Sequence, residues 1–530
     1  MKITFIGAAH EVTGSMHLLS ACGRNILIDC GMEQGTDDYE NSPLPIPASD
    51  IDAVVLTHAH IDHSGMLPFL SASGFGGRIY STPATRDLCS VMLRDSASIQ
   101  ESDAEWKNRK ARRSGEEQVK PLYTLSDAEK TLKLFSPLPY DEKTELAEGI
   151  TLRFCDVGHL LGSASAELWI NENGVSEKLV FSGDIGSTDR PILRDPTRIA
   201  HGDTVIMEAT YGDRDHPPVS DNASELADII SKTLSRGGNV IIPSFAVGRT
   251  QEILYLIRRI KAEGLLGDLG DFDVYVDSPL AVEATKIFTK NDIECFDDEA
   301  ADLVRRGINP LYFPGLRFSE TTEQSKQINS DSSPKVIIST SGMCEAGRIR
   351  HHLKHNLWRQ ESTVVFVGYQ AHGSLGRALC DGAKRVKLFN ETVNVRASIK
   401  RLDGISGHAD RKTLLNWLGA MEPKPRKVYV VHSEDEVADA FSAELCSLGY
   451  NAIAPYSGAS YDLSSGDTLS EGNASPIQKK SVQKSSDAYS RLVSAAARLE
   501  RLVTDMKKGT NKDISRLTDQ IESILSKNKR

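Results

Sequence analysis

Three histidines and one aspartate stand within six residues directly after a short apolar strand, and this cluster constrains the fold more than any other feature. The predicted strand covers Asp52–Leu56, and the cluster reads His58-Ala59-His60-Ile61-Asp62-His63. Imidazole nitrogens and carboxylate oxygens are ligands that zinc accepts. His58 and His60 lie two residues apart at a strand end and point the same way. Asp62 and His63 lie at the next turn, where they can serve a second ion, so the motif predicts a metal centre.

A site for two metal ions needs about seven or eight ligand positions, and three further candidates stand at the ends of other predicted strands. His159, Asp184 and His432 each directly follow an apolar strand. A carboxylate at such a position can bridge two ions. Each of the three could alone be a capping residue or a buried structural residue, but their common placement favours one shared site.

The pattern of apolar segments changes twice along the chain. The first 200 residues contain short apolar strands that end in turns, and from about Val205 longer helical patterns alternate with buried strands such as Val240–Pro243. This βα alternation is typical of a parallel sheet. A strand-rich pattern returns near Val393 and continues to about Tyr456. The middle block is therefore predicted to be an α/β domain inserted into a first domain, because the ends of a domain commonly lie close together.

The composition excludes several classes of protein. Of 530 residues, 39% are hydrophobic, and no stretch approaches the roughly 18 to 20 apolar residues of a membrane helix. The apolar run from Met1 to Gly7 is too short for a signal-peptide core, so we expect a cytoplasmic protein without membrane contact. The eight cysteines form no C-x-x-C pair, which disfavours a thiolate zinc site. A net charge of −11 argues against a uniformly basic nucleic-acid surface but permits local basic patches.

The tail from Glu471 onward differs from the rest of the chain. It carries 13 Lys/Arg against 7 Asp/Glu, a net charge of +6. The Ser/Lys/Gln-rich stretch 475–486 is typical of a linker. Apolar residues at helical spacing follow and predict a helical hairpin: Leu492, Leu499, Leu502, Met506, Ile514, Leu517, Ile521 and Ile524. This basic appendage could be solvated, could contact a second subunit or could contact nucleic acid.

Further short motifs accompany the histidine cluster over about the first 460 residues. They are Leu27-Ile28-Asp29-Cys30-Gly31, Gly158-His159, Ser182-Gly183-Asp184, Glu208-Ala209-Thr210-Tyr211-Gly212-Asp213-Arg214, Pro243-Ser244-Phe245-Ala246-Val247-Gly248-Arg249, Ser341-Gly342-Met343, Ser406-Gly407-His408-Ala409-Asp410 and Val431-His432. With this set the sequence resembles the metallo-β-lactamase fold hydrolases. Within them it is similar to the β-CASP nucleases related to the endonuclease subunit of the cleavage and polyadenylation specificity factor.

The resemblance implies an α/β fold. A four-layer αββα sandwich is expected from residues 1–208 and 395–467, with an inserted α/β β-CASP domain at 209–394 acting as a lid over the active site. Residues 468–530 are expected to form a linker and a basic helical tail.

The resemblance also implies the roles of the candidate ligands. Two zinc ions per chain are expected. His58, His60 and His159 would hold one ion, Asp62, His63 and His432 would hold the other, and Asp184 would bridge them. Asp29 matches a carboxylate of the family that is expected to orient a ligand histidine.

The expected reaction is hydrolysis of RNA phosphodiester bonds by a two-metal hydroxide mechanism, with Asp184 and Asp62 at the metals. The leaving oxygen needs a proton, and the family role of proton donor maps onto His408, with Glu208 as its partner. DNA-specific relatives tend to carry an apolar residue where His432 stands, so single-stranded RNA is the favoured substrate. The sequence leaves open whether cleavage is endonucleolytic or 5′-to-3′ exonucleolytic.

Arg249, Ser341 and Arg377 are the predicted RNA contacts. They lie in loops that follow apolar strands and open helices, where backbone N–H groups can bind phosphate. A homodimer is expected, with further protein partners left open. Two other functions remain: a small-molecule metallo-hydrolase of the same fold, and a partner-dependent subunit of an RNA-processing complex.

Overall fold

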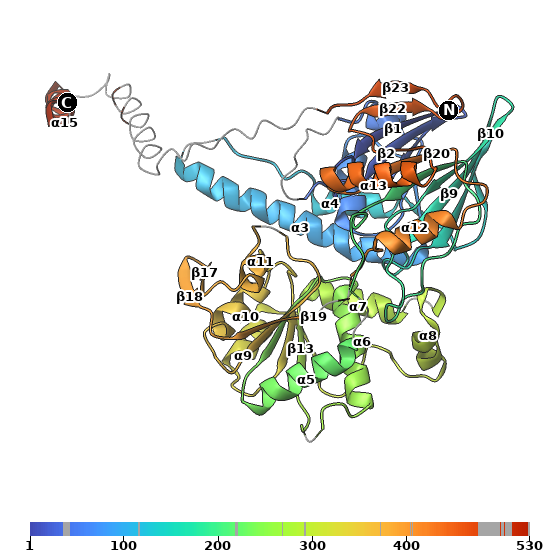
Figure 1. The fold of residues 1–530 in the computed structure, drawn as a ribbon. Helices are drawn as coiled ribbons and strands as arrows, with labels where there is room; N and C mark the ends of the chain where they lie inside the picture. Colours follow the sequence, from blue (N-terminus) through green and yellow to red (C-terminus); the bar gives the residue numbers. More distant parts are fainter. Residues whose placement is uncertain are drawn as a thin grey trace. The chain divides into compact units, whose positions relative to one another are not determined.

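The computed structural model describes residues 1–34, 43–114, 117–217, 221–267, 269–290, 293–371, 373–402, 404, 406–474, 499, 503 and 511–527. The chain divides into two compact units, Met1–Ser475 and Pro476–Arg530. The first unit contains two large sheets that face each other and a third sheet that belongs to the inserted domain (Figure 1).

The first large sheet has eight strands, of which the central ones lead towards the histidine cluster. Their order is β23 (Thr468–Glu471), β22 (Ala459–Asp462), β1 (Lys2–Gly7), β2 (Met16–Ala21), β3 (Arg24–Ile28), β4 (Ala53–Val55), β5 (Arg78–Ser81) and β6 (Phe135–Pro137). β3, β4, β5 and β6 run parallel, so β3 and β4 end at the same edge of the sheet.

The second large sheet has seven strands and supplies the remaining strand ends. Their order is β21 (Ala452–Ile453), β20 (Lys427–Val431), β11 (Thr204–Glu208), β10 (Val175–Phe181), β9 (Ala164–Glu172), β8 (Ile150–Asp156) and β7 (Thr144–Ala147). β10, β11 and β20 are parallel neighbours, so the residues that follow them meet at one edge.

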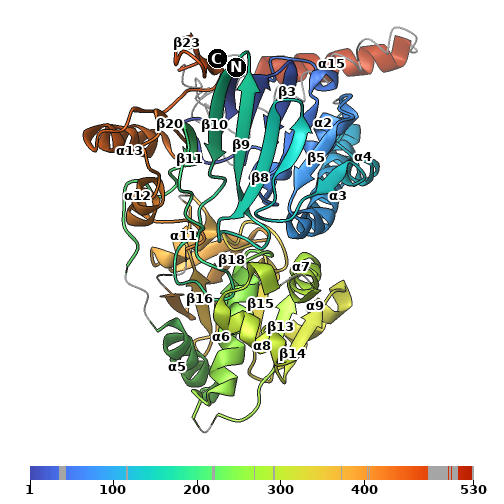
Figure 2. The same ribbon diagram turned by 90° about the vertical axis from the view of Figure 1, so that its right-hand side faces the viewer.

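Helices cover the outer faces of both sheets. Figure 2 shows the layers side by side, with α3 (Pro83–Ser114) and α4 (Leu125–Leu132) in blue on one side and α12 (Arg411–Gly419) and α13 (Asp435–Ser447) in brown on the other. The core between the sheets holds apolar side chains of both, among them Phe5, Leu168 and Phe181. A strand that has one face against the partner sheet and the other against helices has almost all of its residues buried. In β11 every residue from Thr204 to Glu208 is buried. The predicted αββα sandwich is confirmed.

The inserted domain is built on a six-stranded parallel sheet. Its order is β14 (Leu316–Ser319), β13 (Val274–Asp277), β15 (Val336–Ser339), β12 (Val240–Pro243), β16 (Thr363–Val367) and β19 (Ser398–Leu402). One face packs against α5 (Asn222–Ser235), α6 (Arg249–Ala262) and α7 (Pro279–Lys290), and the other against α10 (Ile349–Asn356) and α11 (Leu375–Cys380). The further elements are α8 (Asp298–Arg305), α9 (Thr322–Ser330) and the hairpin β17 (Arg385–Leu388) and β18 (Glu391–Asn394).

From the strand pairings we propose that two domain borders lie later in the chain than expected from the sequence. The insertion was expected to end at residue 394, but β19 pairs with β16 from Ser398 to Leu402, so we propose a border after Leu402. β19 is an edge strand with Lys400 and Arg401 exposed, and its sequence therefore lacks the continuous apolar run of the inner strands. Likewise β23 pairs with β22, which carries the first domain beyond residue 467.

The second unit is described only in part. Its helix α15 spans Asn511–Lys527. The expected linker 475–486 lies outside the described residues, as does most of the first half of the expected hairpin. Among the helices that the structure describes, none combines the length and the apolar character needed to span a bilayer.

Candidate metal centre

The turn between β4 and the short helix α1 (Ile61–Ser64) arranges the histidine cluster. His58 and His63 are buried, and His60 stands at the N-cap of α1. His58 Nε2 lies 3.1 Å from His60 Nδ1, and the same His60 nitrogen lies 3.2 Å from Nε2 of His159, which follows β8. Three imidazoles from two sheets therefore converge on one small volume.

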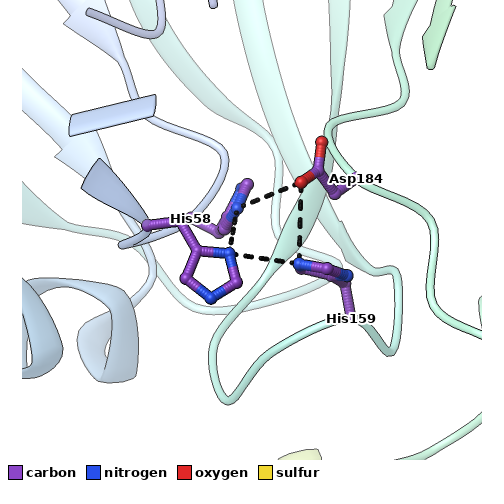
Figure 3. Close-up of side chains that lie close together, drawn as sticks. His58, His159 and Asp184 are labelled. Carbon is purple, nitrogen blue, oxygen red and sulfur yellow. Dashed lines mark hydrogen bonds and ion pairs between the residues drawn. The ribbon is translucent and has the colours of Figure 1, made fainter. Parts of the chain in front are cut away.

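A first cluster consists of His58, His60, His159 and Asp184, each of which offers one ligand atom within 4.8 Å of the others. Asp184 Oδ2 lies 3.4 Å from His58 Nε2 and 3.6 Å from His159 Nε2 (Figure 3). Burial lowers the pKa of all three imidazoles, and neighbouring imidazoles lower it further. The rings are therefore neutral and have nitrogen lone pairs to offer a cation.

A second cluster consists of Asp62, His63 and His432, with the other oxygen of Asp184 close by. Asp184 Oδ1 lies 3.2 Å from His63 Nε2 and 3.5 Å from His432 Nε2, and Asp62 Oδ2 lies 3.6 Å from His432 Nε2. His63 Nε2, His432 Nε2 and Asp184 Oδ1 are buried and have no hydrogen-bond partner among the described residues. Unpaired buried polar atoms are costly, so three of them facing one another fit a bound cation.

Asp184 connects the two clusters because each of its oxygens faces one of them. The residue follows β10 after a turn at Gly183, whose φ of +58° favours glycine. A Cβ at Gly183 would also lie 2.8 Å from the Ala164 carbonyl oxygen. Burial alone would raise the pKa of Asp184, but His432 and His63 outweigh it and hold the pKa well below its usual value. The carboxylate is thus ionised and placed between two groups of ligands.

Side chains and carbonyls around the centre orient its imidazoles through their second nitrogen. Asp29 Oδ2 lies 2.7 Å from His63 Nδ1, and Asp29 also accepts hydrogen bonds from the backbone N–H and hydroxyl of Thr57. His159 Nδ1 lies 3.0 Å from the Gly407 carbonyl oxygen. Neither contact was predicted, although Thr57 directly precedes His58 and Gly407 belongs to a motif given above.

His408 and Glu208 form a pair beside Asp184. Glu208 is the last residue of β11, and each of its carboxylate oxygens lies 3.2 Å from His408 Nδ1. His408 Nδ1 lies 3.9 Å from Asp184 Oδ2. Burial lowers the pKa of His408, but Glu208 and then Asp184 more than offset this and raise it to about 9. The imidazole is therefore protonated at neutral pH and can donate a proton into the centre.

The three residues expected to contact RNA are engaged within the inserted domain. Arg249 is mostly buried and forms an ion pair with Glu252, Ser341 hydrogen-bonds to Ala346 in its own loop, and Arg377 binds Asp381 at 2.9 Å. No contact recorded among the described residues joins any of them to the metal-binding clusters. A role in RNA binding would require Arg249 and Arg377 to share these carboxylates with phosphate.

Arg190 ties the inserted domain to the metal centre, and the sequence analysis did not identify it. Its Nη1 donates to the carbonyl oxygens of His159 and Gly407, both at 2.9 Å, and its Nε donates to Glu252 Oε1 at 3.0 Å. Glu252 belongs to α6 and also binds Arg249. No sequence signal could have identified Arg190, because it lies in an irregular loop far from its partners along the chain.

Comparison with known proteins assigns the chain to a family. Residues 11–230 match the metallo-beta-lactamase superfamily, residues 250–379 the Beta-Casp domain, and residues 392–455 the Zn-dependent metallo-hydrolase RNA specificity domain. Ribonuclease TTHA0252 of Thermus thermophilus is 39% identical over 437 residues, which cover 82% of this chain and 94% of that protein. The chain belongs to the β-CASP family of metallo-β-lactamase fold hydrolases. The resemblance seen in the sequence is thereby confirmed.

Two further relatives match this chain over about two thirds of their own length. Proteins named transcription termination factor FttA from Methanosarcina mazei and Methanocaldococcus jannaschii are 33% and 32% identical. Each match covers 82% of this chain and 67% of the relative. The family, the sandwich fold and the His/Asp clusters together identify the chain as a metal-dependent hydrolase.

Proposed function

We propose that this β-CASP hydrolase is a ribonuclease that cleaves phosphodiester bonds of single-stranded RNA in the cytoplasm. The observation that carries the proposal is Asp184, whose two oxygens face two separate ligand clusters with the protonated His408 beside them. Binuclear sites of this kind suit in-line displacement at phosphorus. The name of the Thermus thermophilus relative supports RNA as the substrate.

The proposed cofactor is a pair of zinc ions per chain. One ion would be held by His58, His60 and His159. The other would be held by Asp62, His63 and His432, and Asp184 would contact both ions. Nitrogen and carboxylate ligands without thiolates fit zinc, and the unpaired buried atoms of the second cluster fit a cation as well. The ions would supply a nucleophile from water at neutral pH and would neutralise charge on the phosphate.

The chain's own residues would supply the remaining steps. His408 would donate its proton to the leaving 3′-oxygen, and Glu208 would keep it protonated and oriented. Asp62 has a side chain that is 21% exposed, so its carboxylate lies where substrate can approach. Asp29 would hold the His63 ring in a fixed orientation. We propose Arg249, Ser341 and Arg377 as phosphate contacts of the inserted domain.

A cleavage assay with end-labelled RNA tests the function. Single-stranded RNA labelled at the 5′ end or, separately, at the 3′ end is incubated with the protein, with and without a chelator. Internal fragments that vanish with chelator would establish an endonuclease, and immediate mononucleotide release from the 5′ label a 5′-to-3′ exonuclease. Intact RNA with metal-loaded protein would contradict the proposal and favour a small-molecule hydrolase or a partner-dependent subunit.

Glu208→Gln should move the alkaline limb of the pH–rate profile to lower pH. The acid His408 must be protonated, so cleavage should fall as pH rises through its pKa, which Glu208 raises. Glu208 raises the pKa of His408 more than any other group does. Loss of its charge should therefore shift the midpoint of the alkaline limb to lower pH by about one unit or more. Single-turnover rates across pH measure the shift. Glu208→Asp keeps the charge and serves as the control, and an unchanged limb in Glu208→Gln would refute the pairing.

We further propose that the protein forms a homodimer through its C-terminal unit. Helix α15 carries Ile514, Leu517 and Ile521 at spacings of three and four residues, and Ile514 is 38% exposed. Leu517→Asp should therefore yield a monomer in light scattering, as should removal of residues 476–530. Ser515→Asp adds the same charge on the exposed side of α15 away from the stripe and should leave the mass unchanged. A monomeric parent protein or a dimeric Leu517→Asp variant would rule out this contact.

A further inference from the structure

Two large aromatic side chains are exposed at the carboxyl edge of the inserted parallel sheet. Phe245 follows β12 and is 49% exposed, and Tyr369 follows β16 and is 44% exposed. β12 pairs with β16 on one side and with β15 on the other, so the loops after these three strands are neighbours. Exposed apolar side chains that gather in one place mark interaction sites more often than single ones do.

The backbone that carries the two rings is fixed, and both loops meet at Gly342 in the loop after β15. The Phe245 ring lies against Gly342, where an added Cβ would come within 3.3 Å of the ring carbon Cε2. The Phe245 carbonyl oxygen accepts a hydrogen bond from the Thr250 hydroxyl at 2.7 Å. The Gln370 side-chain amide donates to the carbonyl oxygens of Gly342 at 3.3 Å and of Tyr369 at 3.0 Å. The loops are thus held in place while ring surface remains exposed.

The loop of Phe245 borders the metal centre. Gly248 lies three residues after Phe245, and a Cβ added there would come within 3.2 Å of Leu160 Cδ1. Leu160 directly follows His159, one of the proposed ligands. The Phe245 loop therefore packs against the segment that carries a proposed ligand.

Tyr369 is linked to the metal centre through the loop of Phe245. The Gln370 side chain joins the Tyr369 carbonyl to Gly342, against which the Phe245 ring lies. Tyr369 therefore shares with Phe245 the sheet edge whose loop approaches Leu160, the residue after His159, at Gly248.

We propose that Phe245 and Tyr369 form a stacking platform for unpaired bases of the RNA strand that is cut at the metal centre. The inference rests on the proposed function and adds the means of substrate selection. Every nucleobase has a π-face, so stacking on aromatic rings holds single strands with little dependence on sequence. Bases of a duplex already stack and pair with one another and are not available. The platform therefore selects single-stranded segments.

Binding measurements separate this platform from the chemistry. The His408→Ala variant serves as the parent because it should keep its metal and bind RNA while cutting it slowly. The dissociation constant of a short fluorescent single-stranded RNA is measured by anisotropy for the parent and for added Phe245→Ala, Tyr369→Ala or both. Each alanine should weaken binding about tenfold, the effect of one lost base stack. Phe245→Trp should restore the affinity, and Phe245→Leu should not.

Tyr312→Ala is the matched control. Tyr312 is 47% exposed in the same domain, but it precedes β14 and so lies at the opposite edge of the sheet. This variant should bind RNA within about twofold of the parent. A second control uses RNA with abasic nucleotides beside the cleavage site. The parent should bind this RNA about as weakly as the double variant binds normal RNA, and the double variant should not distinguish the two RNAs.

The outcomes separate the platform from the proposed function. In one outcome the wild-type protein cuts no RNA, the parent binds RNA, and the alanine variants bind it more weakly than Tyr312→Ala does. In that case the platform stands and the ribonuclease proposal fails. If the wild-type protein cuts RNA and all variants bind equally, the platform is overturned. A parent that binds no single-stranded RNA overturns it as well. Circular dichroism of each variant establishes that lost binding is not lost folding.

Discussion

Asp184→Asn should lose metal and activity together. An asparagine offers one neutral oxygen in place of two charged ones, so it cannot serve the two clusters that Asp184 faces. Removing a buried charge from among four imidazoles at distances of 3.2 to 3.6 Å would also leave the proposed cations without compensation. The single-turnover rate on RNA should fall about a thousandfold, which corresponds to about 4 kcal/mol. Elemental analysis should find fewer than two zinc ions per chain.

The control for this variant is Asp189→Asn. Asp189 is exposed and lies five residues further along the same loop, with a φ of +57° that asparagine tolerates. It should keep its metal and its rate. If Asp184→Asn retains two zinc ions per chain, the bridging role is wrong.

His408→Ala should keep the metal but lose most of the cleavage. Its Nδ1 lies 3.2 Å from both Glu208 oxygens, and we assign the ring to proton donation instead of metal binding. General acids contribute about a hundredfold to ten-thousandfold, so the single-turnover rate should fall by about that factor. The rate on a substrate whose leaving group needs no proton, such as a p-nitrophenyl phosphodiester, should fall much less in this variant.

His201→Ala is the control for the loss of a histidine. Its side chain is 43% exposed and lies near Asp203, away from the clusters. An unchanged rate in His408→Ala would remove His408 from the mechanism. Loss of metal in the same variant would instead show it to be a ligand, as its place in a cluster with Asp184 and His432 allows.

Much of the candidate site could be predicted because its ligands stand at strand ends. His58, His60, Asp62 and His63 form a local motif, and a strand followed by such a motif exposes it at a sheet edge. His159 and His432 are far from this motif in sequence, and the two facing sheets bring them to it. Periodicity alone indicates the strands but not which edges meet, and the family resemblance supplied that information.

The features that were missed depend on irregular loops and on side-chain pairing. Arg190 reaches the His159 carbonyl from a loop without a periodic pattern, and nothing in its local sequence indicates this contact. Arg249 was expected to be available for phosphate, yet Glu252 stands one helical turn away and binds it. That spacing was visible in the sequence. Strand β19, on which the proposed later border of the insertion rests, is half exposed, and its sequence does not resemble that of a buried parallel strand.

A zinc titration of the metal-depleted protein tests the central claim most directly. The protein is stripped with a chelator, dialysed and supplied with zinc in steps, and cleavage of end-labelled single-stranded RNA is followed at each step under single-turnover conditions. Because Asp184 serves two clusters, activity should be absent without metal and should reach its maximum at about two zinc ions per chain. Full cleavage by the stripped protein, or a maximum at one ion per chain, would contradict the account.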